Sequence, residues 1–321
     1  MFNFLILLYF SSKTFIDFIP NQNKQDNSNI IIKENTDEEF KNKYEKLEEI
    51  GKGGCGIVYK AKIKKNGELR AIKFINKKEI KNNLRNEYNS NDIEEEFNKF
   101  QNNLINEIKI MEKCSQNNTN NNSIKYYEYY NTDENFIIIM ELCDTSLQFL
   151  LNKRKNGFNV GEIRDILKQL KNTFKIMKDK KIIHRDLKLD NILIKNEGNN
   201  KIYKLSDYGI SKQLGSVSKC YTHAIGTPFT MAPEVLSGED YNYKCDLWSL
   251  GVIIYQLFFK EYPYKGDTEI ALYRKINNEG HTLLKKSGDS KLDNLIRNLL
   301  IKDPNKRYTW EQYFNDEFFT N

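Results

Sequence analysis

The spacing of hydrophobic and polar positions changes along the chain and divides it into two parts. In the first part, short apolar runs of strand length flank turn-forming residues. The apolar runs at 57–63 and 69–74 lie on either side of Asn66-Gly67, which is typical of a β-hairpin. An unbroken apolar run at 136–140 predicts a further buried strand.

Longer helices are predicted in the second part, where apolar residues recur every three or four positions. The helical ranges are 162–178, 247–259 and 292–300. One helix is also predicted in the first part, because apolar residues recur at helical spacing from Leu104 to Met111. A strand-rich part followed by a helical part, with the boundary near 141–144, predicts an α+β fold.

Three stretches lack this regular pattern. Residues 20–43 are rich in Asn, Lys, Asp and Glu and are predicted to be a disordered linker, so that the folded part begins near Tyr44. Residues 76–103 are also charged and rich in Asn, and we expect a disordered insertion there rather than a docking arm. Residues 2–10 have the length of a signal-peptide core, but no Lys or Arg precedes them and no clear cleavage site follows, which favours a loose extension over an export signal.

Composition narrows the class of protein further. The chain has 321 residues, enough for two lobes with a stable core, and its longest apolar run is far shorter than the roughly 20 residues that cross a bilayer. The formal net charge of +6 comes from basic residues interleaved with acids, which favours a solvated surface over nucleic-acid binding. Five cysteines without paired spacing indicate reduced thiols, so we expect a cytoplasmic protein. Because its apolar runs are short, we do not expect it to associate with membranes.

A glycine-rich segment lies within the first predicted strand pair. Gly51, Gly53, Gly54 and Gly56, followed by Val58, allow the backbone to approach phosphate oxygens closely. A plain hairpin turn would also account for the glycines. The dinucleotide-binding version of the pattern needs a helix directly after the glycines, whereas a strand follows here, which favours a loop that folds over a nucleotide.

Further motifs follow in order along the chain. They are Ala71-Ile72-Lys73 at the end of a strand, the segment from His184 to Asn191, the triplet Asp207-Tyr208-Gly209, and the pair Gly226-Thr227-Pro228 and Ala232-Pro233-Glu234. Each alone has a simple explanation, such as turn formation at Asp186 or Asp207, but their joint occurrence in this order does not. From Tyr44 to Phe319 the chain resembles the protein kinase family.

The resemblance implies a bilobal protein kinase fold, with a small antiparallel β-sheet lobe that contains one main helix and a larger, mostly helical lobe. The kinase domain would cover residues 44–319, with lobes at about 44–140 and 144–319, and residues 1–43 would precede it. The implied activity is signalling by transfer of the γ-phosphoryl group of ATP, with Mg²⁺, to a protein substrate. Lys188 and Thr227 resemble residues of the Ser/Thr-specific members, so the acceptor would be a Ser or Thr hydroxyl.

The resemblance assigns catalytic roles within the segment from His184 and beyond. Asp186 would accept or orient the proton of the substrate hydroxyl, and Lys188 would neutralise the γ-phosphate. Thr227 would contact both residues. Asn191 and Asp207 carry the hard oxygen donors that suit Mg²⁺ and would be its ligands.

Lys73 would hold the α and β phosphates and would itself be held by a glutamate of the predicted helix. Glu107 is the best match for that partner, although 34 residues separate it from Lys73, more than is usual in the family. The competing glutamates at 94–96 lack the apolar face that accompanies Glu107. A pairing of Glu107 with Lys113 on its own helix stays open.

The nucleotide would contact the glycine loop and the boundary between the two lobes. Cys55 stands at the loop tip, and Asp207 completes the phosphate contacts. The adenine ring would bond to backbone groups of Glu141 and Cys143, beside Met140 as the bulky gatekeeper. Three apolar residues would enclose the ring, and all three would also serve as ordinary core: Val58, Ala71 and Leu193.

The chain departs from the family pattern at two positions. Tyr208 replaces the usual Phe, which keeps an aromatic ring but adds a hydroxyl that needs a partner. Cys55 replaces the usual aromatic residue at the tip of the glycine loop. Neither change removes a group needed for phosphoryl transfer, so an active enzyme is favoured over a nucleotide-binding pseudokinase scaffold.

Two other features of the resemblance concern control and stability. Arg185 and Lys212 would bind a phosphate on the segment between Gly209 and Gly226, with Thr222 as the preferred phosphorylation site. Arg307 would pair with Glu234 and, together with Asp246, brace the large lobe without taking part in the site.

Overall fold

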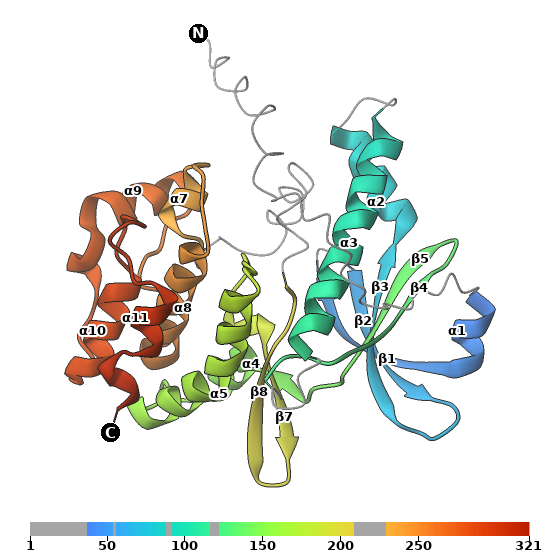
Figure 1. Ribbon diagram of the computed structural model, residues 1–321, viewed down its shortest axis with the longest axis horizontal. Helices are drawn as coiled ribbons and strands as arrows, with labels where there is room; N and C mark the ends of the chain where they lie inside the picture. Colours follow the sequence, from blue (N-terminus) through green and yellow to red (C-terminus); the bar gives the residue numbers. More distant parts are fainter. Residues whose placement is uncertain (1–36, 54–55, 88–91, 116–121, 209–228, 321) are drawn as a thin grey trace. The chain divides into compact units, whose positions relative to one another are not determined.

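A computed structural model describes residues 37–53, 56–87, 92–115, 122–208 and 229–320 (Figure 1). The first half of this part is built on a five-stranded sheet, and the second half is mostly helical. The α+β architecture predicted from the sequence is therefore confirmed.

The five-stranded sheet is antiparallel throughout, with strand order β1-β2-β3-β5-β4. Its strands are β1 (Tyr44–Gly53), β2 (Gly56–Ile63), β3 (Leu69–Asn76), β4 (Tyr126–Asn131) and β5 (Asn135–Met140). The predicted hairpin joins β2 to β3, and Gly67 takes a φ of 78° in its turn, which suits glycine. The register pairs Val58 with Lys73 and Ala71 with Met140, so the predicted nucleotide-binding residues share the central strands.

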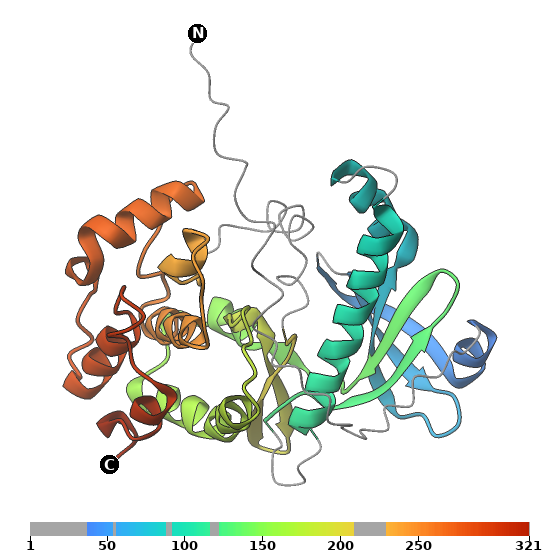
Figure 2. The same ribbon diagram turned by 45° about the horizontal axis from the view of Figure 1, so that its top comes forward.

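Two helices occupy the segment that the sequence suggested was a disordered insertion. They are α2 (Lys77–Glu87) and α3 (Ile93–Ser115), which lies along the sheet (Figure 2). The prediction of disorder between 76 and 103 is wrong for the described residues, because sparse apolar side chains are enough to anchor both helices. Ile80 and Leu84 of α2 are buried, and Phe97 and Phe100 of α3 stack on Phe136 of β5 with ring centroids 5.9 and 6.1 Å apart.

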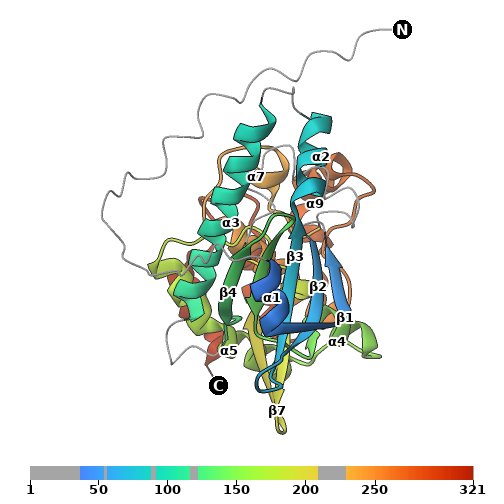
Figure 3. The same cartoon turned by 90° about the vertical axis from the view of Figure 1, so that its right-hand side faces the viewer.

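Helix α1 (Asp37–Lys43) packs on the opposite face of the sheet from α3 (Figure 3). Successive β5 residues point to alternate faces, so Phe136 and Ile138 join the core under α3, whereas Ile137 and Ile139 join a second core that contains Phe40 of α1. The sequence suggested that residues 37–43 belonged to a disordered linker. The structure differs because Phe40 buries its ring among three aromatic residues, Tyr44, Phe74 and Tyr130.

The second half begins with a small sheet and continues with helices. The sheet has the order β6-β7-β8, with β6 (Thr145–Ser146), β7 (Ile192–Glu197) and β8 (Asn200–Leu205). The helices are α4 (Leu147–Lys153), α5 (Val160–Asp179), α7 (Pro233–Leu236), α8 (Lys244–Phe259), α9 (Glu269–Glu279), α10 (Ser290–Leu299) and α11 (Trp310–Phe314). Short 3₁₀ turns lie at Leu189–Asn191, Gly280–Leu283 and Glu317–Phe319. No helix among the described residues is long and apolar enough to cross a membrane.

Candidate active site

Asp186 lies between α5 and β7, and two neighbours in the chain hold its carboxylate. Oδ2 accepts hydrogen bonds from Nζ of Lys188 at 2.8 Å and from Nδ2 of Asn191 at 3.1 Å. Nδ2 of Asn191 also donates to the backbone carbonyl of Asp186 at 2.8 Å. Burial disfavours the charged ammonium of Lys188, but the charge of Asp186 and its hydrogen bond outweigh this effect and raise the pKa of the lysine. The structure thus brings together three residues that the sequence predicted for catalysis and metal binding.

Asp246, a buried residue in the first turn of α8, braces this segment from behind. Its Oδ2 accepts the backbone N–H of His184 at 2.8 Å, and its Oδ1 accepts the backbone N–H of Arg185 at 2.9 Å. Arg185 has a φ of 69°, so the brace holds a left-handed residue directly before Asp186. The sequence suggested only a structural role for Asp246. A sharper signal was available, since an acidic residue at the start of an almost wholly buried helix needs donors for its carboxylate.

His184 links the Asp186 segment to the residues that precede Asp207. Its buried ring accepts the backbone N–H of Asp186 at Nδ1, at 3.3 Å, and its Nε2 lies 3.0 Å from the backbone carbonyl of Ser206. Because Nδ1 is the acceptor, the ring proton is on Nε2 and is donated to Ser206. Burial lowers the pKa of His184, which keeps the ring neutral. The sequence motif includes His184, but the sequence did not predict its hydrogen bonds to Asp186 and Ser206.

Lys73 and Asp207 form an ion pair between β3 and the end of β8. Nζ of Lys73 lies 3.1 Å from Oδ1 of Asp207. The lysine side chain is nearly buried, whereas half of the Asp207 side chain is exposed. The charge of Lys73 lowers the pKa of Asp207, so the carboxylate is ionised at neutral pH. Asp207 has a φ of 52°, in the left-handed region that residues other than glycine seldom adopt.

Glu107 is buried in α3, and the charge of Lys73, which forms an ion pair with Asp207, acts on its carboxyl group. Burial raises the pKa of Glu107 to about 8, although the nearby charge of Lys73 lowers it in part. Its Oε2 is buried and has no hydrogen-bond partner in the described part of the chain. The three competing glutamates have other partners, because Glu94 pairs with Lys81, and Glu95 and Glu96 with Lys99. The electrostatic effect of Lys73 on Glu107 therefore favours Glu107 over these three as the glutamate associated with Lys73.

The glycine hairpin is formed by the ends of β1 and β2, where Gly53 pairs with Gly56. Gly56 has a φ of 129°, and a Cβ at this position would lie 2.1 Å from the backbone carbonyl oxygen of Phe74 on β3. A side chain is therefore excluded here, which explains one glycine of the motif by close backbone approach. Strand β2 also carries Val58, which pairs with Lys73 of β3.

The segment after β5 carries the backbone groups that the sequence predicted would bond to adenine. Ala71 is buried, and Val58, Met140 and Leu193 are partly exposed. The N–H of Glu141 already donates to the carbonyl of Lys125 at 2.8 Å. Within the described residues, the carbonyl of Glu141 and the backbone groups of Cys143 form no backbone hydrogen bond.

The side chain of Glu141 forms a buried charge cluster that sequence reasoning missed. Its carboxylate lies 2.6 Å from Nζ of Lys195 on β7 and 3.1 Å from Nζ of Lys204 on β8. Burial alone would raise the pKa of Glu141, but the two lysines outweigh it and lower the pKa. Nothing in the local sequence indicates this pairing, because more than 50 residues separate the partners.

The hydroxyl of Tyr208, which the sequence suggested would need a partner, has one. The side chain is 3% exposed, its ring centroid is 5.2 Å from that of His184, and its hydroxyl shares a hydrogen bond of 2.5 Å with Oγ of Ser123. The aromatic packing expected of this position is therefore retained.

Several residues predicted from the sequence lie outside the described residues. They are Gly54 and Cys55 of the glycine hairpin, Thr227, and the phosphorylation candidates with Lys212, which fall between 209 and 228.

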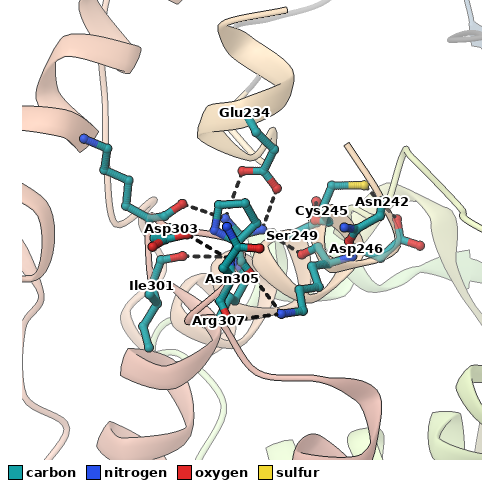
Figure 4. Close-up of polar contacts among 12 residues, drawn as sticks. Glu234, Asn242, Cys245, Asp246, Ser249, Ile301, Asp303, Asn305 and Arg307 are labelled. Carbon is teal, nitrogen blue, oxygen red and sulfur yellow. Dashed lines mark hydrogen bonds and ion pairs between the residues drawn. The ribbon is translucent and has the colours of Figure 1, made fainter. Parts of the chain in front are cut away.

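Arg307 and Glu234 form the structural ion pair predicted from the sequence (Figure 4). Nη1 and Nη2 of Arg307 donate to the two carboxylate oxygens of Glu234 at 2.6 and 2.9 Å. The remaining donors of the guanidinium reach the backbone carbonyls of Ile301, Lys302 and Lys244. All five N–H groups are therefore bonded, which satisfies a fully buried cation.

The donor set near Asp186 suits a hard cation such as Mg²⁺. Both hydrogen bonds from the Asn191 amide use Nδ2, so among the described residues its Oδ1 and the second carboxylate oxygen of Asp207 form no hydrogen bond that would prevent them from binding a cation. In the described part of the chain, no group of three or more His, Cys, Asp or Glu side chains could hold a metal without help. Two protein oxygens with phosphate and water ligands are the usual arrangement for Mg²⁺ in nucleotide sites.

Comparison with known proteins identifies the family that this site belongs to. Residues 44–319 match the family described as "Protein kinase domain". Because the match covers most of the sequence, the chain belongs to the protein kinase family, whose members bind ATP and act on protein substrates.

Similar proteins are named as Ser/Thr kinases or as members of related kinase groups. Serine/threonine-protein kinase ATG1 of Kluyveromyces lactis is 29% identical over 86% of this chain, and a probable myosin light chain kinase of Dictyostelium discoideum is 31% identical over 94%. Calcium-dependent protein kinase 5 of Plasmodium berghei is 34% identical over 71% of this chain. The matches span 36%, 89% and 36% of the three relatives, so this chain covers only about a third of the first and third.

Proposed function

We propose that the chain is an active Ser/Thr protein kinase that transfers the γ-phosphoryl group of MgATP to Ser or Thr residues of protein substrates. The observation that carries the proposal is the Asp186 carboxylate, which Lys188 and Asn191 hold in a segment braced by Asp246. The Lys73–Asp207 ion pair adds a cation and a carboxylate suited to phosphates and Mg²⁺. The names of the related kinases support the same acceptor class.

In the proposed reaction, Asp186 orients the substrate hydroxyl and accepts its proton as the phosphoryl group is transferred. Lys188, whose Nζ is 2.8 Å from Oδ2 of Asp186, would neutralise charge on the γ-phosphate. The raised pKa of Lys188 keeps it protonated for this purpose. Thr227 would complete this group of residues by contacting Asp186 and Lys188. Positioning and charge neutralisation account for most of the catalysis in this kind of reaction.

For the nucleotide, we propose that Lys73 binds the α and β phosphates under the glycine hairpin, including Gly51, Gly53, Gly54 and Cys55. Asp207 and Asn191 would hold Mg²⁺, which neutralises phosphate charge when bound. The carbonyl of Glu141 and the backbone of Cys143 would bond to adenine, between Val58, Ala71 and Leu193 and beside Met140. Glu107 would pair with Lys73 once phosphates and Mg²⁺ compete for Asp207.

Radiolabelled ATP with a generic protein substrate tests the proposal, using wild-type protein and Asp186→Asn. We expect label transfer by the wild type and a loss of about a hundredfold or more in the variant, because the group that accepts the proton is removed. Equal labelling by the two proteins would refute the enzymatic function and leave a nucleotide-binding scaffold.

Control by phosphorylation of the 209–228 segment is part of the proposal. Asp246 fixes the backbone of Arg185, whose guanidinium carbon lies 5.7 Å from the Tyr241 ring centroid. A phosphate on Thr222 would meet Arg185 and Lys212 in charge-assisted hydrogen bonds. Phosphatase treatment and Thr222→Ala should then lower activity to the same level. Unchanged turnover in both cases would exclude this control.

The domain limits and location also stay proposals. We propose a kinase domain at 44–319 with lobes at about 44–140 and 144–319, preceded by an extension, in a cytoplasmic signalling protein.

A further inference from the structure

The hydroxyl of Tyr208 occupies a buried polar site that phosphoryl transfer does not require. It shares a 2.5 Å hydrogen bond with Oγ of Ser123, and it is also hydrogen bonded to Sγ of Cys114 in the last turn of α3. All three side chains are buried, with exposed fractions of 3% or less. A phenol hydroxyl withdrawn from water is costly unless it is bonded, so these contacts favour the inward position of the ring.

Ser123 is itself held by backbone hydrogen bonds to the strand that leads to Asp207. Residue 123 forms a parallel bridge with Leu205. The N–H of Ile124 donates to the carbonyl of Leu205 at 2.9 Å, and the N–H of Leu205 donates to the carbonyl of Asn122 at 2.9 Å. The segment 205–208 is therefore attached to residues 122–124 at both ends, by backbone at Leu205 and by the hydroxyl at Tyr208.

Asp207 lies inside this doubly attached segment and has a strained backbone. Its φ of 52° is unfavourable for a residue with a Cβ, and such conformations persist only where the surroundings hold them. The ion pair with Lys73 is one restraint on Asp207. The side chain of the next residue, fixed by Ser123, is a second restraint that does not depend on the charge of the site.

We propose that Ser123 is a positioning residue, which acts through the hydroxyl of Tyr208 to hold Asp207 in the orientation that faces Lys73. Ser123 touches neither substrate nor cation in this arrangement. The inference rests on the proposed function, since it takes Asp207 as a ligand of Mg²⁺. Its consequence is that Tyr at position 208 stabilises the cation-binding state more than Phe would.

Hydrogen exchange and nucleotide binding test the proposal in the full chain, with Tyr208→Phe, Ser123→Ala and the double variant. The N–H of Ser206 donates to the carbonyl of Asn191 at 2.9 Å, so its exchange rate reports opening of the segment. We expect exchange to be about fivefold faster in Ser123→Ala, which corresponds to one net hydrogen bond, and at least as fast in Tyr208→Phe, which also removes the contact to Cys114. The double variant should be no faster than Tyr208→Phe, because that substitution already removes the bond to Ser123.

The second measurement is the Mg²⁺ concentration needed for half-maximal binding of a fluorescent ADP analogue. Ser123→Ala should need more Mg²⁺, by up to about fivefold, and Tyr208→Phe at least as much, because the apparent affinity falls with the fraction of molecules that hold Asp207 in place, with unchanged binding in excess EDTA. Tyr313→Phe is the matched control, because the Tyr313 hydroxyl is also buried but has no hydrogen-bond partner in the described part of the chain. It should behave as the wild type in both measurements.

The outcomes separate this inference from the proposed function. Faster exchange with an unchanged Mg²⁺ requirement would overturn the positioning role and leave a merely structural hydrogen bond. Unchanged exchange in Tyr208→Phe would overturn the attachment itself. If the wild type bound the analogue without any dependence on Mg²⁺, the proposed function would fail, whereas a Mg²⁺ requirement that only the variants change supports both.

Discussion

Replacing Glu234 by Ala should strongly destabilise the protein, because it leaves the guanidinium of Arg307 charged and buried without its counter-ion. The side chains of Arg307 and Glu234 are 0% and 3% exposed, and two of the five guanidinium hydrogen bonds go to the carboxylate. Breaking a buried pair from one side costs about 3–5 kcal/mol. For a folded unit of this size, about 2–4 °C of midpoint is lost per kcal/mol, so thermal unfolding should shift down by about 6–20 °C.

Urea unfolding followed by tryptophan fluorescence measures this cost directly. The chain has two tryptophans, and the guanidinium carbon of Arg307 lies 5.1 Å from the ring centroid of one of them, Trp248. Lys306→Ala is the matched control, since Lys306 precedes Arg307 and pairs with Asp303 at the surface, 3.9 Å apart and 79% exposed. Surface pairs of this kind contribute about 0–1 kcal/mol. If Glu234→Ala unfolded at the same urea concentration as Lys306→Ala, the reasoning from burial would be refuted.

Three further predictions concern charged residues of the site. Lys73→Met and Asp207→Ala should each lower kcat about a hundredfold or more at saturating MgATP while circular dichroism stays unchanged, and wild-type turnover in either would contradict the proposed roles. Glu107 keeps its proton in the folded protein up to about pH 8, whereas the unfolded chain releases it near the ordinary value of 4.5. The contribution of Glu107 to stability therefore falls as the pH rises between these values. The stability of Glu107→Gln relative to the wild type, measured by urea unfolding, should rise from pH 5 to pH 8. A constant difference between the two proteins would argue against a raised pKa of Glu107. Glu141→Ala removes the carboxylate that pairs with two lysines, of which Lys204 is fully buried, and should cost about 3–5 kcal/mol in the same assay, with a smaller loss expected for Glu141→Gln, which keeps an acceptor.

Sequence reasoning succeeded where a feature depends on neighbouring residues. The β2–β3 hairpin follows from Asn66-Gly67 between two apolar runs, and the contacts among Asp186, Lys188 and Asn191 occur within six residues. Because these residues are close in the chain, their side chains come into contact once the segment folds into a turn. The order of the motifs then indicated the family that the comparison confirmed.

Other features depend on contacts between distant segments, which local patterns do not encode. The sequence predicted Glu107 as the partner of Lys73, with the glutamates at 94–96 as competitors, and only the folded chain shows that Lys73 forms an ion pair with Asp207, 134 residues away. The burial of Phe40 likewise could not be read from a charged stretch with one aromatic residue, because the surface that covers it comes from β3 and β4. A helix with few apolar residues has the same sequence pattern as a disordered segment, and only the surface that it packs against distinguishes the two.

The packing of α1 has a practical consequence for producing the protein. The family match begins at Tyr44, so a recombinant version of the domain could be designed to start at that residue. Such a version would lack Phe40 and would leave the rings of Tyr44, Phe74 and Tyr130 uncovered, since each lies within 5.7 Å of the Phe40 ring centroid. Newly exposed aromatic surface promotes self-association, so a version that starts before Asp37 should elute as a single species under conditions where the shorter one aggregates.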